Sequence, residues 1–123
     1  MSLELKDNKK SIGFSYAWNG IMHVIKHERN FRLHLVSASL VIVAGFICRL
    51  SSFEWMFILL AIGLVLTAEL INSAMESMMD YLKPDIHPIA KQIKDMAAGA
   101  VLISAITAAG IGLIIFAPKL GLF

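Results

Sequence analysis

The sequence predicts an all-α integral membrane protein, with one amphipathic helix at the membrane interface followed by three transmembrane helices. Of its 123 residues, 58% are hydrophobic and only 16% are charged, and the mean hydropathy is +0.73. A soluble domain of this length needs far more polar surface. One Cys, 8 Gly and 3 Pro exclude a disulfide scaffold and a collagen-like chain. The length corresponds to a single membrane-embedded domain over residues 1–123.

Three apolar segments are expected to form the spans. Residues 97–117 carry no charge and are long enough to cross a hydrocarbon core of about 30 Å, so the third span is predicted at about 95–118. The first, at about 33–48, is somewhat short and lies between two arginines that reach the interface. The second, at about 54–80, is predicted as one long helix because its apolar part continues into a polar part without a break.

A further helix is expected before the first span, over about residues 11–29. Apolar and aromatic residues recur there near helical spacing and polar residues fill the other faces, as in helices that lie in the membrane interface. Met1 to Lys10 is polar, which argues against a cleaved signal peptide. Pro84 and Pro88 predict a polar loop over about 81–91 between the second and third spans.

The basic residues are distributed unequally over the two sides of the predicted membrane. Nine lie before the first span or between the second and third spans, against only Arg49 and Lys119 on the other side. The positive-inside rule therefore predicts a cytoplasmic N-terminus and a cytoplasmic 81–95 segment. Eight of the nine acidic residues, all except Glu54, fall on that same side, an asymmetry that the rule does not explain and that indicates a cytoplasmic site.

The second helix carries a stripe of polar residues. Glu69, Asn72, Glu76 and Asp80 project within about 80° of one another and extend over roughly 16 Å. For Asp80, a solvated helix end is an equally good interpretation. Glu69 directly follows the apolar run, where a carboxylate costs about 2.5 to 3.5 kcal/mol at the bilayer centre and is usually functional or paired. A salt bridge to Lys94 is the structural alternative for Glu69.

Glu28, Glu76 and the Lys94-Asp95 pair are expected at one cytoplasmic level. Carboxylates without a cysteine cluster favour a hard ion such as Mg²⁺, held together with phosphate oxygens. The sequence contains no phosphate-binding glycine loop and no protein-kinase motif, so a nucleotide would be held by side chains between helices. His23 and His27 lack the Glu of a zinc protease motif, which argues against a zinc site.

The segment from Glu69 to Glu76, then Asp80, then Ala90 to Asp95 and the run Ala97 to Val101 resemble the signature of the small prokaryotic diacylglycerol kinases. The resemblance covers nearly the whole chain. Ser73 and Met75 stand where Thr and Ile are common, which are conservative departures. Motifs outside the signature resemble the branch that phosphorylates undecaprenol more than the branch that prefers diacylglycerol: Glu28 to Phe31 with His34, Glu54 to Met56, and His87-Pro88.

The resemblance implies a homotrimer in the bacterial plasma membrane, with composite active sites between subunits at the cytoplasmic interface. Its partners would be ATP and a membrane lipid alcohol, with no nucleic acid. Glu69 would be the general base and, with Ala98, would contact the lipid. Glu28 and Glu76 would hold Mg²⁺ at the ATP phosphates, while Asn72 and Asp80 would orient the site.

The resemblance also implies further nucleotide contacts. These are Tyr16, Asp85, Ile86, His87, Lys94 and Asp95, in addition to Glu28 and Glu76. The expected reaction is phosphorylation of undecaprenol, with diacylglycerol as the nearest alternative acceptor. A small proton-coupled transporter is a remote alternative, because it would place its carboxylate near the midplane and would not explain Lys94 and Asp95. A non-catalytic assembly subunit, using the charged layer for docking, is a third hypothesis.

Overall fold

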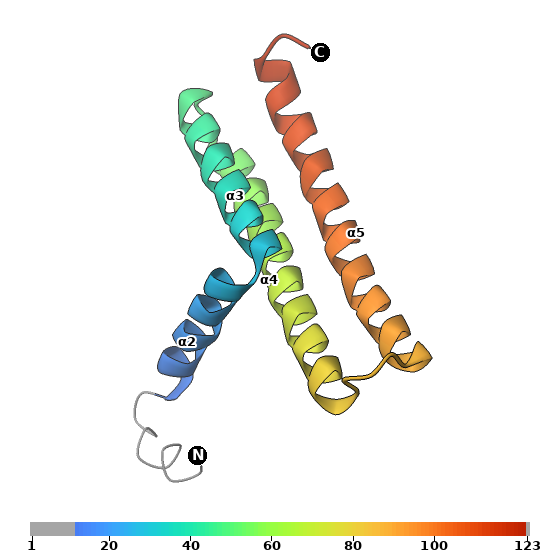
Figure 1. Cartoon of the computed structure of the whole chain (residues 1–123). Coiled ribbons are helices and arrows are strands. Elements are labelled where there is room, and N and C mark those ends of the chain that lie inside the picture. The colour runs from blue at the N-terminus through green and yellow to red at the C-terminus, as the bar shows by residue number, and fades with distance from the viewer. Residues whose placement is uncertain (1–11, 123) are drawn as a thin grey trace.

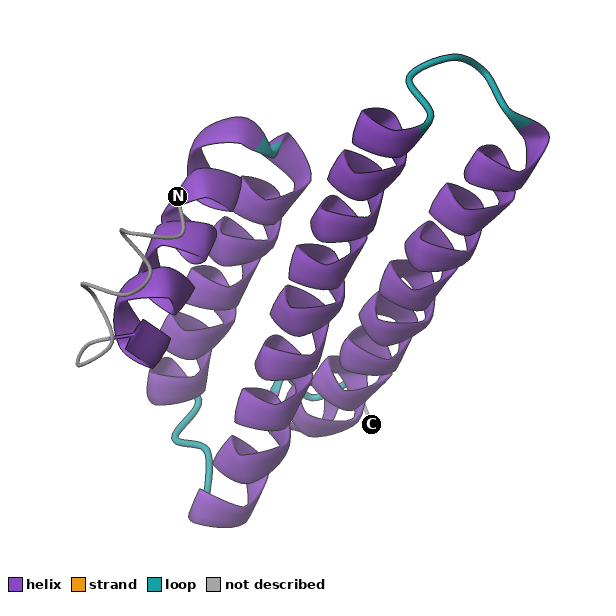
Figure 2. Cartoon of the chain, turned by 90° about the horizontal axis from the view of Figure 1, so that it is seen from below, coloured by secondary structure: helices purple, strands orange, loops and turns teal. Residues whose placement is uncertain are grey.

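The computed structural model describes residues 12–122, and all regular secondary structure in this part of the chain is helical. Its helices are α2 (Ile12–His27), α3 (Arg29–Ile47), α4 (Ser52–Leu82) and α5 (Pro88–Lys119). The last three are long and apolar enough to cross a membrane, as expected from the sequence. The connections between them are short (Figure 2).

Helices α3, α4 and α5 run up, down and up, so that the chain has two distinct ends (Figure 1). The turn between α3 and α4 and the C-terminus lie at one end. Helix α2 and the connection between α4 and α5 lie at the other. We call the first the turn end and the second the charged end. Six basic residues of the described chain belong to the charged end: Lys26, Arg29, Arg32, Lys83, Lys91 and Lys94. Lys6, Lys9 and Lys10 lie outside the described residues.

A single residue separates α2 from α3. Glu28 has an extended backbone, with φ −114° and ψ 112°, and the two helices diverge there (Figure 1). Arg32 spans the break, because its Nη1 donates to the carbonyl oxygens of Ile25, at 2.8 Å, and Lys26, at 3.2 Å. These carbonyls belong to the last turn of α2, where the carbonyl oxygens have no further N–H group of the helix to accept from. The Arg32 side chain therefore holds Glu28 at the joint.

Local sequence explains where α4 and α5 begin. Ser51 and Glu54 form a capping box, with Glu54 N–H donating to Ser51 Oγ at 3.2 Å and Ser51 N–H to Glu54 Oε1 at 2.9 Å. Helix α5 begins at Pro88, earlier than the start expected near residue 95. His87 caps it by accepting from Ile89 N–H at 3.2 Å, and Pro is well suited to a first helical position. Lys94 and Asp95 therefore lie on a helix that is already formed.

The turn end is the best-packed part of the described chain. Leu50 of the turn between α3 and α4, Ile58 of α4 and Ile115 of α5 form a buried cluster, with Val41 of α3 and Trp55 of α4 packed against it. Gly45 lets α3 approach closely, because a Cβ there would lie 2.6 Å from the Trp55 ring. Lys119 and Glu54 form an ion pair at 3.1 Å between the C-terminal end of α5 and the first turn of α4. These contacts fix α3 and α5 against α4.

Candidate active site

The polar stripe of α4 runs from a buried to an exposed environment. Because α4 is continuous from Ser52 to Leu82, its four polar residues lie on one helix as expected. Glu69 is 2% exposed and Asn72 is 7% exposed, whereas Glu76 is half-buried and Asp80 is exposed. Asn72 Nδ2 donates to Glu76 Oε1 at 3.4 Å. The stripe thus connects a carboxylate removed from water to one that water reaches.

The buried carboxylate of Glu69 is paired with a histidine. His34 Nε2, on α3, lies 3.7 Å from Glu69 Oε2. The structure does not contain the Glu69–Lys94 salt bridge that we considered as the structural alternative. Lys94 instead forms an ion pair with Asp80, because the early start of α5 places Lys94 opposite the last turns of α4. Asp80 is therefore exposed to solvent and forms an ion pair with Lys94.

A pocket at the connection between α4 and α5 gathers half of the expected nucleotide residues, together with Asp80. It has a volume of about 230 Å³ and is lined by side chains from the end of α4, the connection and the start of α5. Asp80, Asp85, Ile86, His87 and Lys94 were expected at the site and line it together. We call it the basic pocket, since three lysines line it, a composition that suits phosphate oxygens.

Sequence reasoning missed two of these lysines. Lys83 and Lys91 had been used only to predict which side of the membrane is cytoplasmic, yet both line the basic pocket. Lys91 also forms an ion pair with Asp95 at 2.6 Å, one helical turn away. Lys91 and Asp95 are four residues apart on a helix, and this spacing alone predicts that their side chains can form an ion pair.

Other expected site residues lie apart from the basic pocket. Glu28 is half-buried at the joint between α2 and α3, close enough to act electrostatically on Glu69, as Glu76 does. Tyr16 is exposed on α2, and Ala98 is exposed on α5. None of Glu28, Glu69 and Glu76 lines the basic pocket. In a single chain the acidic cluster around Glu69 and the basic pocket are therefore two separate regions.

The residues near Glu69 suit a hard cation in their chemistry but do not form a complete cage. Glu28 and Glu76 offer carboxylate oxygens, and the buried Asn72 Oδ1 has no hydrogen-bond partner in the described chain. Within residues 12–122, no group of three or more acidic, His or Cys side chains is close enough to hold a metal ion. An incomplete set of oxygen donors is typical of Mg²⁺ sites, where phosphate and water supply the remaining ligands.

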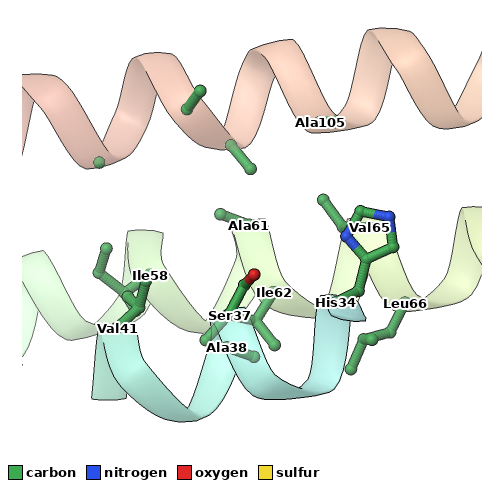
Figure 3. A pocket seen from close by; sticks show the side chains of 13 residues that line it. His34, Ser37, Ala38, Val41, Ile58, Ala61, Ile62, Val65, Leu66 and Ala105 are labelled. Carbon is green, nitrogen blue, oxygen red and sulfur yellow. The ribbon is translucent and has the colours of Figure 1, made fainter. Parts of the chain in front are cut away.

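A second, apolar cavity opens beside Glu69. It has a volume of about 380 Å³ and lies among α3, α4 and α5, lined almost entirely by aliphatic side chains and Ala (Figure 3). His34 and Ser37 are its polar lining residues. Figure 3 shows the His34 imidazole beside Val65, one helical turn from Glu69 on α4. The buried carboxylate therefore lies next to a cavity that suits a hydrocarbon chain.

A helical membrane protein with an acidic cluster beside an apolar cavity, and a basic pocket at the end of the same helix, has the parts of an enzyme that transfers a group from a water-soluble donor to a lipid. The chain matches the model of the prokaryotic diacylglycerol kinases over residues 15–116. It belongs to this family and is a lipid kinase, which confirms the resemblance inferred from the motifs of α4 and α5.

Curated relatives agree with this membership. The undecaprenol kinase of Bacillus subtilis (strain 168) is 41% identical over 123 residues, which cover 96% of this chain and all of the relative. The diacylglycerol kinase of Synechocystis sp. is 37% identical over 110 residues, covering 89% of this chain and 63% of that protein. The diacylglycerol kinase of Escherichia coli (strain K12) is 29% identical over 93 residues, covering 76% of each chain.

Proposed function

We propose that this lipid kinase transfers the γ-phosphoryl group of ATP to the hydroxyl of undecaprenol, giving undecaprenyl phosphate and ADP. The observation that carries the proposal is the position of Glu69, a buried carboxylate beside an apolar cavity and on the same helix as Asp80, which lines the basic pocket. The similarity to the Bacillus subtilis undecaprenol kinase over its whole length supports this acceptor over diacylglycerol.

The polar stripe of α4 suits a reaction between a lipid and a water-soluble donor. A lipid alcohol stays in the membrane, so its hydroxyl meets the protein at the buried end of the stripe. In the proposed reaction Glu69 accepts the proton of that hydroxyl while its oxygen forms a bond to the γ-phosphorus, and the bond to the ADP oxygen breaks. Positioning and charge neutralisation supply most of the catalysis in such transfers.

The donor side of the site is assigned to the other polar groups. Glu28 and Glu76 would hold Mg²⁺, which neutralises phosphate charge when bound. Lys94 and its neighbours in the basic pocket would contact the nucleotide phosphates, and Asn72 would keep Glu76 oriented through its hydrogen bond. Tyr16 and Asp95 are proposed as further nucleotide contacts, and Ala98 as a lipid contact.

We infer a homotrimer, with each active site shared between neighbouring subunits. The separation of the acidic cluster from the basic pocket within one chain supports this inference. The unpartnered Ser73 Oγ, which is buried on the same helix as the stripe, supports it as well. The proposed orientation places the charged end in the bacterial cytoplasm, with α2 in the membrane interface, because basic residues concentrate at that end.

The proposal is tested by supplying both acceptors to the same preparation. The purified chain is reconstituted in vesicles with Mg²⁺ and ATP labelled at the γ position, and undecaprenol and a diacylglycerol are offered separately and in competition. We expect the label on undecaprenol, with a higher kcat/KM than on diacylglycerol. Preferential labelling of diacylglycerol would show that diacylglycerol is the preferred acceptor and would contradict the proposed one. Labelling of neither alcohol would overturn the proposed activity.

A further inference from the structure

Within the described part of the chain, His34 is the one nitrogen-bearing ionisable side chain within ion-pairing distance of Glu69. The other ionisable groups that act on Glu69 there are Glu28 and Glu76, which carry the same charge as Glu69. The lysine expected nearby, Lys94, is paired with Asp80 instead. A carboxylate that is 2% exposed is costly to bury without a donor. His34 is therefore the group that compensates the burial of Glu69.

The geometry of the pair suits a donor that aligns the carboxylate. His34 Nε2 and Glu69 Oε2 are 3.7 Å apart, within ion-pairing distance and slightly longer than a hydrogen bond. Contacts of this kind are often long in the free enzyme and shorten when substrate binds. When Nε2 donates to Oε2, Oε1 is the oxygen left to take the proton of a lipid hydroxyl. His34 thereby distinguishes the two oxygens of Glu69.

His34 also faces the space through which a lipid would approach. It lines the apolar cavity, and the other polar lining residue, Ser37, donates its hydroxyl hydrogen to the Leu33 carbonyl oxygen at 2.9 Å. His34 therefore lies at the cavity wall with its Nε2 3.7 Å from the buried Glu69 carboxylate. A hydroxyl at the end of a chain in this cavity would meet His34 and Glu69 together.

We propose that His34 is a positioning residue for this kinase, holding the Glu69 carboxylate at the wall of the apolar cavity so that one oxygen receives the proton of the lipid alcohol. The inference rests on the proposed function and deepens it by giving the base a fixed orientation. His34 itself transfers no proton in this scheme, so the balance of the reaction is unchanged.

Three substitutions at this position distinguish positioning from packing. His34→Leu removes the donor, His34→Gln places an amide N–H near the position of Nε2, and His34→Asn carries an amide too short to reach it. We expect kcat for undecaprenol to fall about 30-fold in the Leu and Asn variants, as for the loss of a hydrogen bond to a charged group, and to stay within about 3-fold of wild type in the Gln variant. The KM for ATP should change little in all three.

Ser39→Ala is the matched control, because Ser39 lies on the same helix and donates its hydroxyl hydrogen to the Leu35 carbonyl oxygen at 2.9 Å, but neither lines the apolar cavity nor lies near Glu69. It should keep wild-type kcat. A second measurement combines His34→Leu with Glu69→Gln: if His34 acts through Glu69, the double variant is no slower than Glu69→Gln alone. Size-exclusion chromatography establishes that each variant keeps the wild-type assembly.

Specific outcomes overturn the inference while leaving the proposed function in place. One is a wild-type kcat in His34→Leu when Glu69→Gln is inactive. Another is an equal loss of kcat in His34→Gln and His34→Leu. The third is a double variant whose loss of kcat is the product of the losses in the two single variants. A wild-type chain that phosphorylates neither alcohol would instead overturn the proposed function itself, together with the inference that depends on it.

Discussion

The two ends of this molecule are built for different tasks. At the turn end, apolar side chains from α3, α4 and α5 pack together, and the ion pair of Glu54 and Lys119 joins the helix ends. At the charged end, α2 diverges from α3, and Asn72 Oδ1 and Ser73 Oγ are buried without a partner in the described chain. The turn end therefore stabilises a single chain, whereas the polar half of α4 keeps buried polar atoms without a partner in the described chain, as the proposed shared active site requires.

The largest effect among tests of this comparison is expected at the charged end. Glu76→Gln removes a proposed magnesium ligand and the charged acceptor of Asn72. We expect kcat to fall about 100-fold, with little change in thermal unfolding, because about 3 kcal/mol of transition-state stabilisation depends on that charge. The measurement is lipid phosphorylation over a range of free Mg²⁺, and higher Mg²⁺ should restore part of the rate. A variant with wild-type magnesium dependence would contradict the assignment.

The matching change at the turn end is Gly45→Leu. A Cβ at this position already meets the Trp55 ring at 2.6 Å, so a larger side chain must push α3 away from α4. Overpacking of this kind costs about 1 to 3 kcal/mol of stability. Thermal unfolding in detergent should show the loss, while the kcat of the folded fraction stays near wild type. Full stability in this variant would show that the close approach of α3 to Trp55 is unimportant.

Lysines at the two ends permit a more direct comparison. Lys94 and Lys119 each pair with a carboxylate on α4, but Lys94 lines the basic pocket and Lys119 lies at the turn end. Lys94→Gln should raise the KM for ATP about 10-fold, which corresponds to about 1.4 kcal/mol. Lys119→Gln is the control and should leave it unchanged. Equal effects of the two substitutions on the KM would remove the functional distinction between the ends.

The smallest effect is expected from Ser51→Ala. This change removes the hydroxyl that accepts from Glu54 N–H and so opens the capping box of α4. Loss of such a cap costs about 1 kcal/mol. Thermal unfolding should detect it, and kinase activity should not change. A loss of activity at unchanged stability would mean that the turn end contributes to catalysis as well.

Much of the fold was readable from the sequence because each element depends on local pattern. The charge-free run after Asp95 and the apolar run before Glu69 predicted membrane-spanning helices, and the spacing of the four polar residues predicted their common helix. The start of α5 was missed although its signal was local, since His87 and Pro88 are a good cap and a good first residue.

The contacts between helices could not be predicted in the same way. Glu69 pairs with His34 and Lys94 with Asp80, and each choice depends on the register between two helices rather than on spacing along one. The basic pocket likewise depends on how tightly α5 turns back on α4, which is why Lys83 and Lys91 had no assigned role. Family resemblance predicted which residues form the site and left their pairing within the chain open.

The central claim, that the buried carboxylate of α4 takes the proton of the lipid alcohol, is tested most directly by comparing two carboxylates of the same helix. Glu69→Gln and Glu54→Gln each neutralise one acid on α4, and Gln can still close the capping box at residue 54. The measurement is kcat for undecaprenol in vesicles with saturating ATP and Mg²⁺. We predict that Glu69→Gln lowers it about 1000-fold and that Glu54→Gln leaves it near wild type. A Glu69→Gln protein as active as Glu54→Gln would contradict the account.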